Sequence, residues 1–339
     1  MSTDFYVQSK KAIYIIISTF LSVLYIFSYL NIPNDILRDR FNYIVYASNY
    51  EIIHEMRMGE GFIFNEPLFI YINKFSNMFF VPEHIPLFFV FINSVTLMWL
   101  LVEKSKNILF FLLGFSLILF VPYVFQSQII TLRQALATSV FLMAFFYLKD
   151  NWKIFIVSLI CCLIHSVFFI IALFYFLNFI FLKKLTFELK MIINFFMMLS
   201  ISLGFILITQ YLGVRQANSY SDVEINVGGG AFLLFLGVFI TLYTQRKKYN
   251  NEHFTFLMGG MVLFLVGYFL GPLSGRLFNT FFPFIVLFLV SVNSYLSLSI
   301  MLLLSFVYGF LYFNGGYNAL LEDPYNSFTE FFSNINYLM

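Results

Sequence analysis

Charged residues are scarce in this 339-residue chain: Asp, Glu, Lys and Arg together make up 11% of it, against about 25% in a typical soluble domain. The net charge is only +2, and no basic run is longer than Arg246-Lys247-Lys248, so no patch for a nucleic acid is expected. The sequence also has no phosphate-binding glycine loop, no nucleophile elbow and no Asp-x-Asp pair. These absences argue against a soluble protein and against a metal-dependent enzyme that uses nucleotide sugars.

Cysteine is almost absent as well. The chain has two cysteines, Cys161 and Cys162, which are adjacent and lie within an apolar run. This pair has no metal-binding spacing and is interpreted as small apolar packing residues. No metal or cofactor is expected from the sequence.

Apolar residues are correspondingly abundant in the sequence. They make up 61% of the chain, and the mean hydropathy is +0.87. Runs of roughly 18–25 apolar residues are typical of membrane-spanning helices, so we expect an all-α polytopic membrane protein. About nine full spans are predicted, at 12–30, 85–102, 107–125, 131–148, 190–212, 231–245, 254–270, 277–293 and 295–313.

The distribution of charge predicts the orientation of one membrane domain over residues 1–339. Lys10 and Lys11 precede the first run, which has no cleavage site of small residues, so a retained span with a cytoplasmic N-terminus is expected. Three segments are predicted to be external, namely 31–84, 213–230 and 314–339, and the turn from Gly271 to Arg276 is expected on the same side. The segment 31–84 should contain a surface helix, because Tyr43, Tyr46, Tyr50, Ile53 and Arg57 recur at helical spacing.

Residues 154–182 form an anomalous apolar run. Its 29 residues would make about 43 Å of helix, and lysines flank both ends. A single span would place one lysine pair outside, against the positive-inside rule. A re-entrant hairpin of two short helices with His165 near its tip keeps both pairs inside, and two tilted full spans are the alternative.

Isolated arginines gather at the predicted outer ends of the spans, namely Arg38, Arg133, Arg215 and Arg276. Arginine holds phosphate through paired, charge-assisted hydrogen bonds, so a site for a lipid-linked anion is expected. An arginine near the end of a span more often extends to lipid headgroups, and a histidine in an apolar run is often a satisfied core residue. Ionisable residues at membrane depth nevertheless mark functional sites by default, which favours Arg133 and His165.

At these residues the chain resembles the EpsG family of polysaccharide-biosynthesis membrane proteins, which includes O-antigen polymerases of the Wzy type. The order and spacing of several short motifs together carry the resemblance. They are Arg38-Asp39-x-x-x-Tyr43, Glu51, Asn65-Glu66-Pro67-Leu68-Phe69, Leu132-Arg133-Gln134-Ala135-Leu136-Ala137, Ile164-His165-Ser166, and Arg276 with Phe281-Phe282.

The resemblance implies a bundle like those of GT-C membrane glycosyltransferases and a function at the outer face of the bacterial inner membrane. Such enzymes transfer a growing glycan from one undecaprenyl pyrophosphate to the repeat unit on another. The expected partners are these lipid-linked oligosaccharides and the bilayer, with a chain-length regulator protein as a further candidate.

The expected roles follow from the implied reaction, which needs no metal. Arg133 and Arg276 would hold the pyrophosphate, and Gln134 would position it or the sugar. His165 would be the general base, with Asp39 or Glu66 as the second choice, and a loose transition state would need no strong base. The remaining predicted substrate-binding residues are Arg38, Asp39, Glu66, Arg215 and Tyr220.

Two other functions fit the sequence. A flippase or transporter of lipid-linked oligosaccharide would also need a basic cavity, although internal repeats are expected in such a fold and none is visible. A membrane acyltransferase that modifies sugars would also use a histidine in the membrane. The predicted outward position of His165 argues against this second function.

Overall fold

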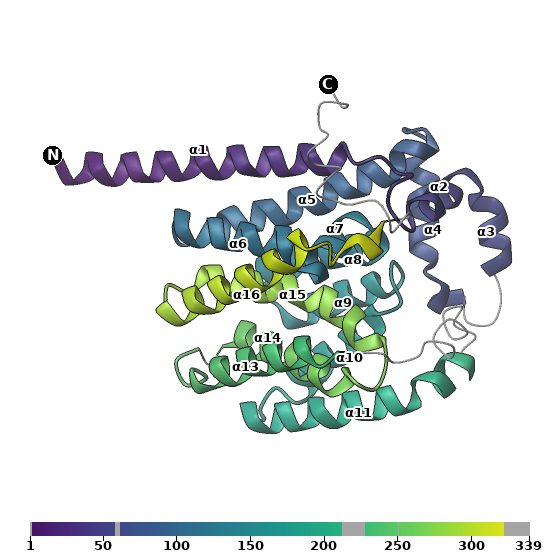
Figure 1. Cartoon of the computed structure of the whole chain (residues 1–339). Coiled ribbons are helices and arrows are strands. Elements are labelled where there is room, and N and C mark those ends of the chain that lie inside the picture. The colour runs from purple at the N-terminus through teal and green to yellow at the C-terminus, as the bar shows by residue number, and fades with distance from the viewer. Residues whose placement is uncertain (1, 58–61, 212–227, 250, 322–339) are drawn as a thin grey trace. The chain divides into compact units, whose positions relative to one another are not determined.

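The computed structural model describes residues 2–57, 62–211, 228–249 and 251–321. Within these ranges every regular element is helical, and the only extended pairing is an isolated antiparallel bridge between Leu37 and Leu321 (Figure 1). The all-α prediction is therefore confirmed for this part of the chain. Most of the predicted external segments 213–230 and 314–339 falls outside the described residues.

Five helical segments are long and apolar enough to cross a membrane, as judged by length and composition. They agree with five of the predicted spans, and they make this chain a membrane protein. The segments are Lys11–Leu30 within α1 (Ser2–Leu30), Pro82–Lys104 with α5 (Ile85–Lys104), Phe187–Gly204 within α11 (Phe187–Tyr211), α15 (Leu273–Ser291) and α16 (Tyr295–Phe313).

The predicted span 107–125 is not one straight helix. It consists of α6 (Ile108–Phe120) and α7 (Pro122–Ile129), which are bent by 69° relative to each other. Val121 between them is extended, with φ −83° and ψ 121°, because proline disfavours the helical conformation in the residue before it. Pro122 then starts a new helix at a position where its missing N–H costs nothing. The prediction of a continuous span was wrong at this point.

Three predicted spans are formed by helices of 15 or 16 residues. They are α8 (Leu132–Tyr147), α13 (Gly230–Thr244) and α14 (Glu252–Gly267). Sixteen residues of helix are about 24 Å long, which is short of the roughly 30 Å of a bilayer core. The count of nine full spans therefore stays a prediction, as does the GT-C arrangement.

The chain divides into two compact units, and the division passes through α8 and α15. Unit 1 comprises Met1–Ser48, Phe79–Ala135 and Ile285–Met339. In this unit α1 packs along α5 and α6, and α16 packs along α6. Unit 2 comprises Asn49–Met78 and Leu136–Phe284. In this unit α14 packs against both α11 and α13.

Apolar and aromatic packing forms the interior of unit 2. Phe256 on α14 lies 5.0 Å from Phe281 and 4.8 Å from Phe284, both on α15, between ring centroids. A reciprocal pair of amides crosses this interior, in which Asn178 donates to Asn194 at 2.8 Å and Asn194 donates back at 3.2 Å. Both amides are buried, and such pairs join helices where few other polar partners exist.

The apolar run 154–182 forms the predicted hairpin in unit 2. Helix α9 (Asn151–Cys162) ends before a turn, and α10 (Phe168–Tyr175) follows and continues into a π-helical segment (Phe176–Phe181). The two arms are antiparallel, because the Tyr175 hydroxyl donates to Asn151 Oδ1 at 2.6 Å and the Trp152 ring lies 6.5 Å from that of Phe176. His165 lies in the turn, as expected. The depth of the hairpin in a bilayer stays a prediction.

The predicted external segment 31–84 contains helices, and the helical spacing from Tyr43 to Arg57 corresponds to two helices separated by Asn49. The second of these, α3, packs against α4 in unit 2. The helices are α2 (Arg40–Ser48), α3 (Tyr50–Arg57) and α4 (Pro67–Ser76), and short 3-10 turns lie at Phe62–Asn65, Pro82–His84 and Asn318–Leu320.

Candidate functional site

Arg133 is the second residue of α8 and contacts two tyrosines of α2, all within unit 1. Its Nη1 donates to the Tyr46 hydroxyl at 3.3 Å, and its guanidinium carbon lies 5.4 Å from the centre of the Tyr46 ring and 5.9 Å from that of Tyr43. Tyr43 and Tyr46 are three residues apart, so they share one face of α2. The two rings hold the cation in place from one side.

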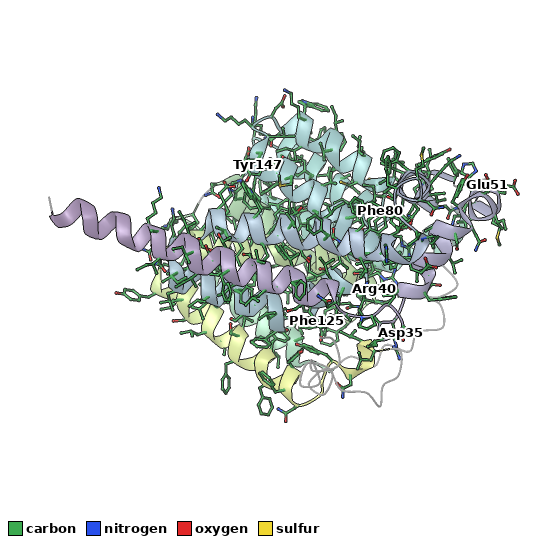
Figure 2. All side chains as sticks on the ribbon, turned by 90° about the horizontal axis from the view of Figure 1, so that it is seen from above. Asp35, Arg40, Glu51, Phe80, Phe125 and Tyr147 are labelled. Carbon is green, nitrogen blue, oxygen red and sulfur yellow. The ribbon has the colours of Figure 1, made fainter. Side chains whose placement is uncertain are left out.

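Arg40, the first residue of α2, is completely buried in unit 1 (Figure 2). Its Nε donates to the Ile129 carbonyl at 2.6 Å, and its Nη1 donates to Asn34 Oδ1 at 2.9 Å. Its Nη2 is buried, and among the described residues it has no hydrogen-bond partner and no carboxylate forms a salt bridge with Arg40. An ionised group buried in this way is costly.

Burial lowers the pKa of Arg40 from its ordinary value of 12.5 to about 10. Arg40 therefore remains a cation at neutral pH and carries a penalty of a few kcal/mol. Tyr43 is the neighbour that the two arginines share, since its hydroxyl interacts electrostatically with both guanidinium groups. We call Arg40, Arg133, Tyr43 and Tyr46 the arginine cluster. An anion beside it would gain two charged donors and would relieve the penalty on Arg40.

Glu66 lies at the N-terminus of α4 in unit 2 and has an unusual backbone, with φ 62° and ψ 51°. This left-handed conformation is costly for a residue other than glycine. Its carboxylate makes no hydrogen bond that caps its own helix. Instead, Oε1 accepts the Ser166 N–H at 3.2 Å from the hairpin turn, while the Leu68 N–H donates to the Leu163 carbonyl at 2.9 Å. These two hydrogen bonds join the start of α4 to the turn.

His165 faces this carboxylate. Its Nε2 lies 3.9 Å from Glu66 Oε1, and both side chains are about 95% buried. Its Nδ1 accepts the Val167 N–H at 3.3 Å, so in the neutral imidazole the proton resides on Nε2. We call Glu66, His165 and Ser166 the Glu–His cluster. This cluster brings together Glu66 and His165, which are far apart in the sequence and were predicted as functional for different reasons.

The family model of the EpsG family matches residues 11–333, which is nearly the whole chain. The chain belongs to the EpsG family. This is a bacterial membrane family of Wzy-like polysaccharide polymerases, so the resemblance seen in the motifs is confirmed. No curated protein and no solved structure matches the chain.

Three further residues predicted from the EpsG motifs lie in unit 1. Gln134 is buried next to Arg133 on α8. Arg38 is exposed, and its Nε donates to the Leu321 carbonyl at 3.1 Å. Asp39 is also exposed, and Asn42 donates to its Oδ1 at 3.2 Å. The structure thus places Asp39 in a polar, accessible position, whereas Glu66 is enclosed beside a histidine.

Arg276 lies in the first turn of α15 and is half-buried in unit 2. The sequence placed it in an outer turn from Gly271 onwards, and this boundary was wrong because the helix begins at Leu273. A cation near a helix N-terminus is unfavourable beside the positive end of the dipole. An anion bound there would offset that repulsion. Arg215 and Tyr220 lie outside the described residues.

Sequence reasoning did not single out Arg40, which the structure places beside the predicted residue Arg133 through their shared neighbour Tyr43. Arg40 stands among acids in a polar segment, where a solvated arginine is the ordinary expectation. The available signal was its position beside Arg38 and Asp39, three residues before Tyr43, in a motif that the resemblance had already marked. Its burial depends on contacts with Asn34 and Ile129, and the latter is distant in sequence.

Proposed function

We propose that this protein polymerises undecaprenyl-pyrophosphate-linked oligosaccharide repeat units into O-antigen, capsule or exopolysaccharide at the outer face of the bacterial inner membrane. Membership of the EpsG family over residues 11–333 is the observation that carries this proposal. The arginine cluster supports it, because a buried arginine with an unpartnered donor suits a phosphorylated ligand. The external position of the site and the lipid carrier are parts of the same proposal.

The arginine cluster would hold the pyrophosphate of the donor. In the transfer, the bond between the anomeric carbon and the pyrophosphate oxygen breaks, and the lipid pyrophosphate leaves with the bonding electrons. Arg40 and Arg133 would meet the charge that develops on the leaving oxygen. This arrangement gives cationic side chains the task that a divalent metal ion performs in many nucleotide-sugar transferases, so we propose metal-independent transfer.

The Glu–His cluster would act on the acceptor. As the acceptor hydroxyl attacks the anomeric carbon, its proton passes to the carboxylate of Glu66. Glu66 suits this task better than His165, because Nδ1 of the imidazole already accepts the Val167 N–H, which leaves the proton on Nε2, 3.9 Å from Glu66 Oε1. His165 would position the carboxylate and stabilise its charge. The Ser166 N–H holds the carboxylate from the other side.

Two conservative substitutions separate these roles. Glu66→Gln removes the base and should lower the polymerisation rate by about 10²–10⁴-fold. His165→Gln keeps a donor near the position of Nε2 and should retain activity within about tenfold of the unsubstituted enzyme. The measurement is the ladder of glycan lengths formed by purified enzyme in liposomes from lipid-linked repeat units, extracted from cells that lack this gene.

Each departure from this pattern has a definite meaning. If His165→Gln abolishes polymer formation and Glu66→Gln does not, the general base is His165 and not Glu66. If the unsubstituted enzyme forms no ladder but moves lipid-linked units across the membrane, the transporter function replaces the polymerase. Normal membrane abundance of each variant is the control for folding.

A further inference from the structure

Residues of helices α3 and α4 line a half-open cavity of about 380 Å³ in unit 2. Each helix contributes one face, since the lining residues recur at intervals of one and four positions along both helices. The lining residues are Tyr50, Glu51, His54 and Glu55 from α3 and Ile70, Tyr71 and Lys74 from α4. This volume lies within the range of small-molecule sites. The cavity contains none of the groups assigned to the reaction above.

The lining combines aromatic faces with hydrogen-bonding groups of both kinds. His54 Nε2 and the Tyr71 hydroxyl are 3.1 Å apart, and the Tyr50 hydroxyl donates to Glu51 Oε1 at 2.8 Å. Lys74 places its ammonium 4.8 Å from the centre of the Tyr50 ring. Tyr71 is 50% exposed, so its ring remains accessible to a ligand.

This composition matches the surface of a sugar. A pyranose ring presents C–H groups on its faces, which pack on an aromatic ring, and hydroxyls around its rim, which need donors and acceptors. The carboxylates of Glu51 and Glu55 are acceptors only, whereas Lys74 is a donor only. Glu51 is exposed as well as lining the half-open cavity (Figure 2). A phosphorylated ligand would instead meet two carboxylates and one ammonium, so a neutral glycan fits the cavity better than an anion.

Helix α4 connects this cavity to the Glu–His cluster. Glu66 precedes the first residue of α4, and the cavity residues Ile70, Tyr71 and Lys74 follow on the same helix. Tyr71 is five positions after Glu66, which corresponds to about 7.5 Å along the helix axis. That rise is comparable to the length of one or two sugar units.

We propose that the α3–α4 cavity is a glycan-binding subsite, which holds a sugar of the oligosaccharide one or two units away from the reacting hydroxyl. This inference rests on the proposed polymerase function and adds the place where the chain binds its sugar. The subsite would align the acceptor for Glu66 and would select for the structure of the repeat unit. Tyr71 and Tyr50 are then specificity-determining residues that take no part in the chemical step.

The test is a separation of KM from kcat in the liposome assay, with lipid-linked repeat units from the gene-deleted strain as substrate. Tyr71→Ala and Tyr50→Ala should each raise KM by about tenfold with kcat nearly unchanged, because loss of an aromatic anchor weakens binding. Tyr71→Phe keeps the ring and should restore most of the affinity. Phe75→Ala is the matched control, since Phe75 is an exposed aromatic residue of α4 that does not line the cavity.

The outcomes distinguish a failure of the proposed glycan-binding subsite from a failure of the proposed polymerase function. If the unsubstituted enzyme polymerises and the tyrosine variants have the KM of Phe75→Ala, the subsite is wrong and the polymerase function stands. A fall in kcat with unchanged KM would also overturn the subsite, because it would indicate a structural role. If the unsubstituted enzyme forms no polymer, the function itself fails. Glu51→Gln, at an exposed position, provides the same KM test if an alanine variant does not fold.

Discussion

At the scale of single residues, burial distinguishes Arg40 from the other arginines discussed above. Arg38 is exposed and Arg133 is partly exposed, whereas Arg40 is fully enclosed with a pKa lowered to about 10. In the unfolded chain Arg40 keeps its proton up to about pH 12.5. The loss of folding stability caused by burying its charge is therefore fully present below pH 10 and declines only above that pH. Throughout the physiological range the folded protein therefore carries this cost, and a bound anion would offset it.

This cost leads to a prediction about ligand-induced stability. Inorganic pyrophosphate should raise the melting temperature of the purified protein in detergent, because a ligand that binds only the folded state stabilises it. Arg40→Lys keeps the charge but loses the planar fork, so it should lose most of this shift. Arg246→Lys is the control, because Arg246 pairs with Glu188 at 3.1 Å in unit 2 and has no assigned role. An undiminished shift in Arg40→Lys would contradict the assignment.

The sequence identified most of the candidate residues but not their pairings. Arg133, Glu66 and His165 could be recognised from short motifs, because each residue type limits the chemistry available to it. The contact of Glu66 with the hairpin turn could not be predicted, since Glu66 and Ser166 are 100 positions apart and the contact requires a left-handed backbone that few non-glycine residues adopt. Arg40 was missed because a polar segment looks the same whether an arginine in it is solvated or buried.

At the scale of helices, the apolar runs predicted most elements well, because the length of a run largely determines the length of its helix. The predicted spans 12–30, 85–102 and 295–313 agree closely with α1, α5 and α16. Hydropathy does not indicate where a helix changes direction within an apolar run, so the sequence did not predict the 69° bend at Val121. The proline that follows was the available local signal. Charge at both ends of the run 154–182 predicted that the chain turns back within it, and α9 and α10 are antiparallel; whether they are re-entrant or cross the membrane fully stays a prediction.

Close helix packing in unit 2 gives a prediction at this scale. A Cβ on Gly260 of α14 would lie 2.5 Å from Cγ and 2.8 Å from Cε1 of the Phe281 ring on α15. The ring is rigid and completely buried, so Gly260→Ala should destabilise the protein by about 1–3 kcal/mol through overpacking.

The control for this prediction is a second helical glycine. A Cβ on Gly237 of α13 would meet nothing within 4 Å, so Gly237→Ala should be neutral or stabilising by up to about 1 kcal/mol. Melting temperatures of both variants in the same detergent test the pair. Equal melting temperatures would show that α14 and α15 do not pack this closely in the folded protein.

At the scale of the whole molecule, the distribution of charge predicts which ends of the helices face which side of the membrane. The lysines that flank the hairpin give the strongest constraint. Because the arms are antiparallel and Tyr175 bonds Asn151, the two ends of the hairpin lie close together. Lys153 lies in the first turn of α9 and Lys183 follows the π-helical segment, so we expect both lysines on the same side of the membrane. The positive-inside rule assigns that side to the cytoplasm.

Single-cysteine labelling tests this orientation, and the chain is well suited to it because its native Cys161 and Cys162 are buried. In a variant with both replaced by alanine, cysteine introduced at Glu51 should react with a membrane-impermeant maleimide in intact cells. Cysteine introduced at Lys153 or at Lys183 should react only after the membrane is permeabilised, and all three positions are exposed on the protein.

The pattern of labelling decides between specific topologies. Labelling of Lys153→Cys and Lys183→Cys from opposite sides would show that the run 154–182 crosses the membrane once, and the hairpin would be wrong. Labelling of Glu51→Cys only after permeabilisation would place the α3–α4 cavity in the cytoplasm. An enzyme that uses undecaprenyl-pyrophosphate-linked units at the outer face could not bind its acceptor there, so this one result would overturn both the proposed location of the reaction and the proposed subsite.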